Sequence, residues 1–169
     1  MNKTIIAIDP GTHRSAWIEY TPETHHIGEF GIYDNCDLVA NFAFCRWHRH
    51  VLAIEMIASY GMPVGQEVFE TCVWIGRFME AFGSGEFVYR KDVKLHLCQS
   101  PRAKDANVRQ AIIDLFPATG GGKTPQIGTK KQPGPLYGMS SHVWSALGVA
   151  LTYAANNSFN SRESNNDTH

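Results

Sequence analysis

The sequence predicts an α/β fold with a five-stranded mixed sheet, combining an antiparallel meander with parallel strands, flanked by helices. Two short apolar runs, residues 4–8 and 51–54, are typical of buried strands, and each ends in a carboxylate, Asp9 or Glu55. A helical segment between the two runs predicts a crossover that makes these strands parallel. The 169 residues suffice for one domain with a hydrophobic core.

The first three strands are expected to form an antiparallel meander. Residues 14–20 and 26–31 favour strands, and the Thr-Pro-Glu-Thr stretch at 21–24 is typical of a turn between them. A helix is expected at about 35–47, capped by an Asp or Asn at its start. This order leaves the strand at 51–54 beside the first strand.

Asp9 is followed by Pro10 and Gly11, which end the first strand and turn the chain. On this stretch alone, an aspartate that starts a turn is as good an explanation as a functional carboxylate. Asp9 and Glu55 are nevertheless expected at the same carboxyl edge of adjacent parallel strands. Open α/β sheets place their sites at that edge.

The second half of the chain is predicted from helical periodicity and from its breaks. The expected elements are a helix at 64–82, a strand at 87–89, helices at 91–97 and 103–116, and a last helix at 141–155. The glycine- and proline-rich stretch 117–139 predicts a mobile basic loop. Residues 1–156 are expected to form the domain, and 157–169 a disordered polar tail.

The glycine run before Lys123 is not a phosphate-binding loop. That pattern needs a glycine where Pro117 stands, with a strand before it and a helix after it. Here the preceding segment is a predicted helix, and prolines follow.

Composition indicates an ordinary globular protein, with 43% hydrophobic and 18% charged residues. No apolar run approaches the roughly 20 residues of a membrane span, and no signal peptide is evident, so no membrane partner is expected. The four cysteines are widely spaced and lack a CxxC pair, which favours reduced thiols and a reducing cytosol. They are Cys36, Cys45, Cys72 and Cys98.

The net charge of −1 conceals an asymmetry. Between Arg90 and Lys131 there are nine Lys or Arg residues and three Asp, a local excess of 9 − 3 = +6. Such a concentration of positive charge favours one face that binds an anion, although a solvated helix surface would show the same composition.

Four segments in order resemble one family. They are residues 5–12 (IIAIDPGT), 52–55 (LAIE), 93–94 with 103–104 (VK and AK), and 142–150 (HVWSALGVA). This set resembles the RuvC family of Holliday-junction resolvases, of the RNase H-like superfamily, and looks most like its short phage-encoded members. The likeness covers about residues 3–155.

The resemblance implies an RNase H-like fold and a crossover-junction endodeoxyribonuclease of recombination, repair or phage DNA processing. It also implies a bacterial or phage-infected host cytoplasm as the location. It implies a homodimer, because a four-way junction has two-fold symmetry. Phosphodiester hydrolysis of this kind uses two Mg²⁺ ions, for which Mn²⁺ can substitute, held by carboxylates. Asp9 is the expected bridging ligand and Glu55 the second. An accessory helicase is not predictable from the sequence.

The last helix departs from the commonest family pattern, which has two acids three residues apart. Those positions are His142 and Ser145, which share one helix face. His142 is the expected third ligand and proton-handling group, with a solvent-exposed histidine as the alternative. Ser145 cannot replace the charge of a carboxylate, so the second metal is expected to be weak unless Asp105 or another acid compensates.

The basic face then has a predicted role in contacting DNA phosphates. The expected DNA-binding residues are Lys94, Arg102, Lys104, Arg109, Lys123, Lys130 and Lys131, with Tyr60 placed to meet unstacked bases. Three alternatives stay open: a nuclease of the same fold directed at flaps, forks or single-strand ends, a non-catalytic protein that binds branched DNA, and an ATPase-like domain. The last is disfavoured, since the chain is short and lacks phosphate loops.

Overall fold

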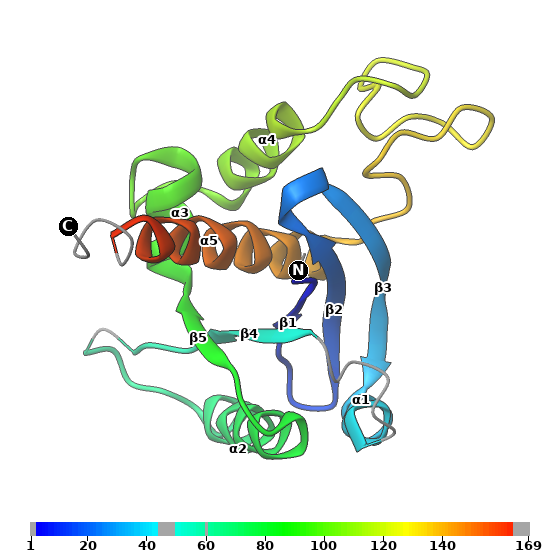
Figure 1. Cartoon of the computed structure of the whole chain (residues 1–169). Coiled ribbons are helices and arrows are strands. Elements are labelled where there is room, and N and C mark those ends of the chain that lie inside the picture. The colour runs from blue at the N-terminus through cyan, green and yellow to red at the C-terminus, as the bar shows by residue number, and fades with distance from the viewer. Residues whose placement is uncertain (1–2, 44–49, 60, 164–169) are drawn as a thin grey trace.

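The structure is a computed structural model of the whole chain, and it describes residues 3–43, 50–59 and 61–163 (Figure 1). Residues 43 and 158–163 are described by their backbone alone. Five strands form one sheet in the order β3-β2-β1-β4-β5. The strands are β1 (Ile5–Asp9), β2 (Arg14–Thr21), β3 (His26–Asp34), β4 (Val51–Met56) and β5 (Glu86–Tyr89).

The pairing of these strands confirms the predicted mixed sheet. β1 and β2 are antiparallel, as are β2 and β3, whereas β1 with β4 and β4 with β5 are parallel. The helices are η1 (Pro22–Thr24), a 3₁₀ turn, α1 (Asn35–Ala43), α2 (Gln66–Phe82), α3 (Arg90–Cys98), α4 (Asp105–Leu115) and α5 (Ser141–Glu163).

The sheet separates two hydrophobic layers. Helix α5, with α3 and α4 beside it, covers one face, and α1 and α2 cover the other (Figure 1). Side chains alternate along β1, so Ile5 and Ala7 join the α5 layer while Ile6 and Ile8 join the α1–α2 layer. This alternation directs the next residue, Asp9, toward the face that α5 covers.

Most predicted boundaries agree with the structure to within two or three residues. The predicted end of the first helix, at 47, lies outside the described residues. Helix α5 continues to Glu163, eight residues past its predicted end, and so enters the segment expected to be a tail. No proline or glycine interrupts residues 149–163, so nothing in this stretch stops the helix at 155. The side-chain amide of Asn157 also donates a hydrogen bond to the Tyr153 carbonyl, one turn earlier in the helix, at 3.0 Å.

The segment 117–139 contains no helix or strand, as predicted, but backbone hydrogen bonds fold it on itself. Gly120 donates to the Pro125 carbonyl at 2.8 Å, and Gly134 donates to the Ile127 carbonyl at 2.9 Å. A Cβ atom at Gly134 would lie 2.3 Å from the Pro125 oxygen, so only glycine fits there. The segment forms an extension that projects beyond the sheet (Figure 1).

Two further expectations concern cysteines and membranes. Cys36, Cys72 and Cys98 are free, and Cys45 lies outside the described residues. Among the helices in the described part of the chain, none is both long enough and apolar enough to cross a bilayer.

A buried polar network holds the turn that follows β1. Asn35, only 1% exposed, accepts a hydrogen bond from the Ser15 hydroxyl at 2.7 Å and donates to the Gly11 carbonyl at 2.9 Å. The Gly11 amide in turn donates to the Ser15 hydroxyl oxygen at 3.2 Å. These bonds join the start of α1 to the chain just after Asp9, and they thereby fix the position of that carboxylate.

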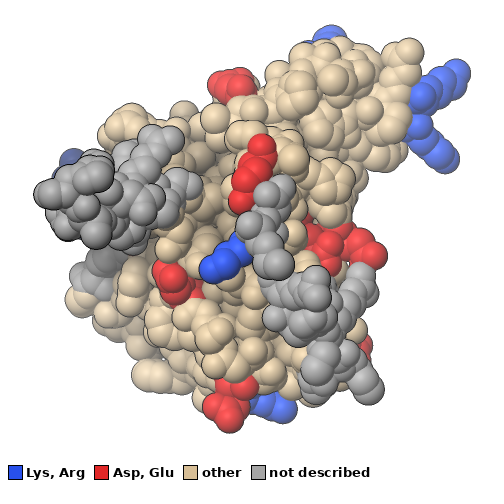
Figure 2. Space-filling model, in the orientation of Figure 1, with Lys and Arg blue, Asp and Glu red and all other residues tan. Residues whose placement is uncertain are grey.

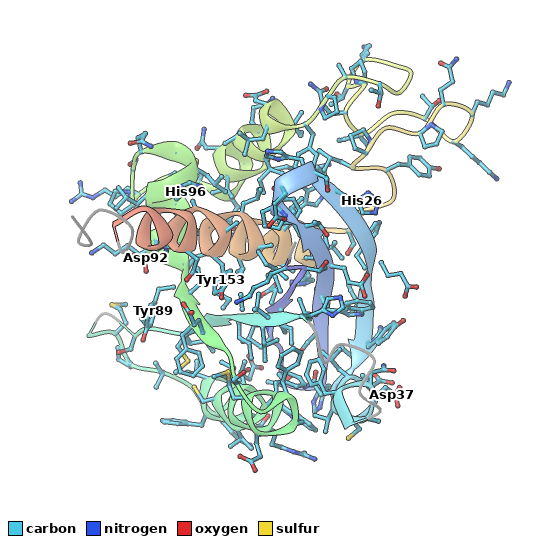
Figure 3. The ribbon with its side chains drawn as sticks, viewed as in Figure 1. His26, Asp37, Tyr89, Asp92, His96 and Tyr153 are labelled. Carbon is cyan, nitrogen blue, oxygen red and sulfur yellow. The ribbon has the colours of Figure 1, made fainter. Side chains whose placement is uncertain are left out.

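We expect Asn35→Leu to lower the free energy of unfolding by about 2–4 kcal/mol, because it removes the acceptor of the buried Ser15 hydroxyl and the donor to the Gly11 carbonyl, at roughly 1–3 kcal/mol each. Urea unfolding monitored by circular dichroism measures the change. Asp37→Asn, on the same helix with an exposed side chain, is the matched control and should change stability by less than about 0.5 kcal/mol (Figure 3). Equal stability of Asn35→Leu and the wild type would show that the network does not hold the turn.

Candidate active site

Two carboxylates lie side by side at the carboxyl edge of the sheet. Ile8 of β1 pairs in register with Ile54 of β4, so Asp9 and Glu55, the next residue on each strand, are neighbours. Glu55 is also in register with Val88 of β5, which belongs to the core layer under α5. The two acids thus share the carboxyl edge of adjacent parallel strands, as the sequence predicts, and both face α5.

Burial perturbs both acids. Their side chains are only 18% and 16% exposed, for Asp9 and Glu55 respectively. Burial raises the pKa of Asp9 above its usual 3.8, and the contact with His142 acts against this rise. Burial, and then the charge of Asp9, raises the pKa of Glu55 to about 7. Glu55 Oε2 is buried and, among the described residues, has no hydrogen-bond partner. A cation beside these acids would compensate their burial.

His142 stands in the first turn of α5 and reaches the same place. Its Nδ1 lies 3.2 Å from Asp9 Oδ2, so a protonated Nδ1 donates a hydrogen bond to that carboxylate. The rest of the ring faces outward, because the side chain is 71% exposed. The structure thus brings together the three residues predicted as ligands, although only Asp9 and His142 are in direct contact.

Arg90 is a site residue to which the sequence reasoning assigned no role. Its guanidinium lies between three elements: Nη1 is 3.6 Å from Glu55 Oε2 and donates to Ser145 Oγ at 3.3 Å, and Nη2 donates to Asp105 Oδ1 at 2.8 Å. A signal was present in the sequence, since Arg90 directly follows β5, whose carboxyl end lies at the same edge of the sheet.

The two residues considered as a fourth metal ligand, Ser145 and Asp105, both accept hydrogen bonds from Arg90. Ser145 accepts its hydrogen bond, and Asp105 binds both Arg90 and Lys94, whose Nζ lies 3.6 Å from Asp105 Oδ1. The hydrogen bond from Arg90 holds the pKa of Asp105 below its usual value. Asp105 is therefore a partner of cations at the border of the site.

A cleft of about 360 Å³ opens beside the carboxylates, between α4 and α5. Its walls include Arg90, His142 and Ser145, which places the polar groups of the site at its border. The guanidinium of Arg109 stacks over Trp144 at 4.8 Å from the ring centre, and both residues line the cleft. The cleft gives a ligand in solvent access to Arg90, which is itself 27% exposed.

The other predicted DNA-binding residues that the structure describes lie on the surface, outside the cleft. Arg102 and Lys104 are exposed before and at the start of α4, and the three lysines of the 117–139 extension are also exposed. Figure 2 shows Lys and Arg side chains at the outer end of that extension. Tyr60 lies outside the described residues. The extension lysines are Lys123, Lys130 and Lys131.

The donor set fits one Mg²⁺ ion. Asp9 and Glu55 supply adjacent carboxylate oxygens, one of them buried without a hydrogen-bond partner, and Mg²⁺ prefers oxygen ligands and retains several waters. The residues do not fit a second ion, because Ser145 and Asp105 are held by Arg90. In the described part of the chain, no group of three His, Cys, Asp or Glu side chains is close enough to hold a metal ion.

Two solved structures are similar to this fold. A structure of RuvC from Thermus thermophilus is similar with a TM-score of 0.62 and 15% identity, over 89% of this chain and 93% of that chain. The same protein in complex with a Holliday junction substrate is similar with a TM-score of 0.63 and 16% identity, over 90% and 92%. The chain has a RuvC-like fold. No family model and no curated protein matches the sequence.

The RuvC-like fold agrees with the resemblance inferred from the four sequence segments. At 15–16% identity the likeness concerns the fold alone, so the particular likeness to phage-encoded members stays a prediction. The roles of the site residues are likewise proposals.

We expect the metal-free protein to lose stability as pH rises from about 4.5 to 7. In this window the unfolded chain has released the proton of Glu55 while the folded chain retains it, because burial raises the folded pKa to about 7. Asp9 shifts in the same direction. Urea unfolding in EDTA across this pH range measures the slope, which should be smaller in Glu55→Gln. A slope that is unchanged in Glu55→Gln would contradict the raised pKa.

Proposed function

We propose that the protein is a divalent-metal-dependent endonuclease that hydrolyses phosphodiester bonds in branched DNA, with the four-way junction as its substrate. The observation on which the proposal depends is the pair of buried carboxylates, Asp9 and Glu55, at one edge of the sheet. Such burial is costly for a purely structural purpose, and it suits a site that binds a hard cation. The RuvC-like fold supports the choice of substrate.

Each residue of the site has a role in this reaction. Asp9 and Glu55 would hold Mg²⁺ or Mn²⁺, which activates water and stabilises the charge that develops on the phosphate. His142 contacts Asp9 through Nδ1, and its exposed ring can accept a proton from the attacking water. In hydrolysis a water oxygen bonds to phosphorus, the bond to one ester oxygen breaks, and that oxygen receives a proton.

The basic residues around the site would position DNA. Lys94 contacts Asp105, and Arg109 lines the cleft between α4 and α5, while Arg102, Lys104 and the extension lysines are exposed on the surface. This arrangement suits contacts to phosphates on both sides of the scissile bond, which fix register without reading sequence. Tyr60 remains a proposed contact for unstacked bases.

A homodimer is part of the proposal, since two symmetric cuts in a junction need two sites. Helix α2 presents large apolar side chains to solvent on its outer face: Phe69 is 63% exposed and Val73 62%. Such a face on the layer opposite α5 is a candidate interface between two copies of the chain.

A second candidate function is a non-catalytic protein that binds branched DNA. It is favoured by one observation, that Ser145 stands on α5 where the resembling family usually has an acid, and is bound by Arg90. A nuclease directed at flaps or forks is a third possibility with the same site. Cleavage assays on several DNA structures distinguish the three.

We expect Asp9→Asn and Glu55→Gln each to reduce Mg²⁺-dependent cleavage of a labelled four-way junction at least a hundredfold, about 2.7 kcal/mol of barrier. Junction binding in EDTA should change little, because both replacements are nearly isosteric. Asp34→Asn, an exposed acid paired with Arg14, is the control and should cleave normally.

The assay includes a fork, a flap and a linear duplex. Preferential cleavage of the fork or flap would favour the third possibility, and junction binding without cleavage of any DNA would favour the non-catalytic one. Near-normal cleavage by either carboxylate variant would contradict the assignment of Asp9 and Glu55 as metal-binding residues.

The three lysines of the extension should contribute to the salt dependence of junction binding. Each phosphate contact changes the slope of log K against log [salt] by about 0.9, so replacing all three by alanine should reduce the slope by roughly 2.7. Fluorescence anisotropy in EDTA at several NaCl concentrations measures it. Lys3→Ala, just before β1 and away from the carboxyl edge, is the control. An unchanged slope would remove the extension from the DNA interface.

A further inference from the structure

Arg90 stands where the site lacks the ligands for a second metal. A two-metal site needs carboxylates on both sides of the scissile phosphate. Here the helix position one turn beyond His142 is Ser145, and it faces a guanidinium at 3.3 Å. The same guanidinium lies 3.6 Å from Glu55 Oε2. A fixed cation, from the chain itself, thus lies against the carboxylate that would otherwise help to hold a second ion.

The charge of the site supports one divalent ion. When ionised, Asp9, Glu55 and Asp105 give three negative charges, against the two positive charges of Arg90 and Lys94. One divalent ion and one phosphodiester bring this group to neutrality. Two divalent ions and the same phosphodiester would leave two positive charges in a half-buried site, which the low dielectric makes unfavourable.

Arg90 is also placed to reach a substrate. It contacts β4, α4 and α5 through three named partners, which hold the guanidinium in place without rearrangement. It lines the cleft beside the carboxylates and is partly exposed there. A guanidinium has five N–H donors in a planar fork that suits phosphate oxygens, and a preorganised donor of this kind stabilises charge in a transition state.

We propose that the Arg90 guanidinium takes the place of a second metal ion, so that each chain binds one divalent ion at Asp9 and Glu55 while Arg90 binds the scissile phosphate. The inference rests on the proposed endonuclease function and deepens it. Arg90 acts through its positive charge, which a lysine retains without the planar fork of donors and which a glutamine lacks.

The first test is the number of ions bound, which needs no cleavage. Full-length protein is titrated with MnCl₂ while free Mn²⁺ is followed by electron paramagnetic resonance. We expect one Mn²⁺ per wild-type chain above the background of the Asp9→Asn/Glu55→Gln variant, and one in Arg90→Lys. The Arg90→Gln/Ser145→Asp variant, which removes the cation and adds a carboxylate, should bind two. Two site-specific ions in the wild type, or none, would overturn the inference.

The second test is cleavage of the four-way junction at saturating Mn²⁺. Arg90→Lys should retain cleavage to within about tenfold, and Arg90→Gln should lose at least a hundredfold. Arg77→Gln, on helix α2 of the opposite layer, is the matched control and should cleave normally. Equal cleavage by the lysine and glutamine variants would overturn the role of the charge. If Arg90→Gln fails to fold, as judged by circular dichroism, the number of Mn²⁺ ions bound by the wild type and by Arg90→Lys still tests the inference.

The two proposals fail in different ways. One bound ion with no cleavage of any DNA overturns the endonuclease function. Two bound ions with normal junction cleavage overturn the role of Arg90 alone.

Discussion

The parallel pairing of β1 with β4 is the constraint on which the site depends. Ile8 opposite Ile54 places Asp9 next to Glu55 on the face covered by α5. Because side chains alternate along a strand, a slip of one residue would send one carboxylate to the other face and Ile8 or Ile54 into the wrong layer. The same apolar contacts that stabilise the sheet therefore also hold the two acids together.

Helix α5 serves the core and the site at once. Its inner face, which includes Val143, Ala146 and Leu147, packs on the sheet and is almost fully buried. His142 and Ser145, three residues apart, emerge at the border of that packed face and meet Asp9 and Arg90 respectively. Since the helix is locked by its apolar residues, these two polar side chains are held in place without a flexible loop.

Charge balance explains why the site tolerates several buried polar groups. Arg90 compensates Glu55 and Asp105, and Lys94 adds a second cation beside Asp105. The pKa of Glu55 nevertheless remains raised to about 7, because burial and the charge of Asp9 outweigh the effect of Arg90. Arg90 thus compensates only part of the negative charge at Asp9 and Glu55, while Asp105 has two cations beside it.

The sequence by itself determined the order of strands and helices and the place of the two acids. Residues 4–8 and 51–54 are short apolar runs that end in carboxylates, and local periodicity with turn residues is enough to predict such elements. His142 could be placed near the acids because helical spacing and a known family pattern were both available. The polar composition of residues 157–169 predicts a tail, but α5 continues to Glu163 because no residue before that point stops a helix.

Only the tertiary structure decided the partners of Arg90. Its contacts to Glu55, Ser145 and Asp105 join residues separated by 15 to 55 positions in the chain, and no local pattern encodes such distances. The fold of the 117–139 extension likewise depends on backbone hydrogen bonds between its own turns. Propensity and periodicity report on neighbours along the chain, whereas the charge balance of a site depends on which side chains packing brings together.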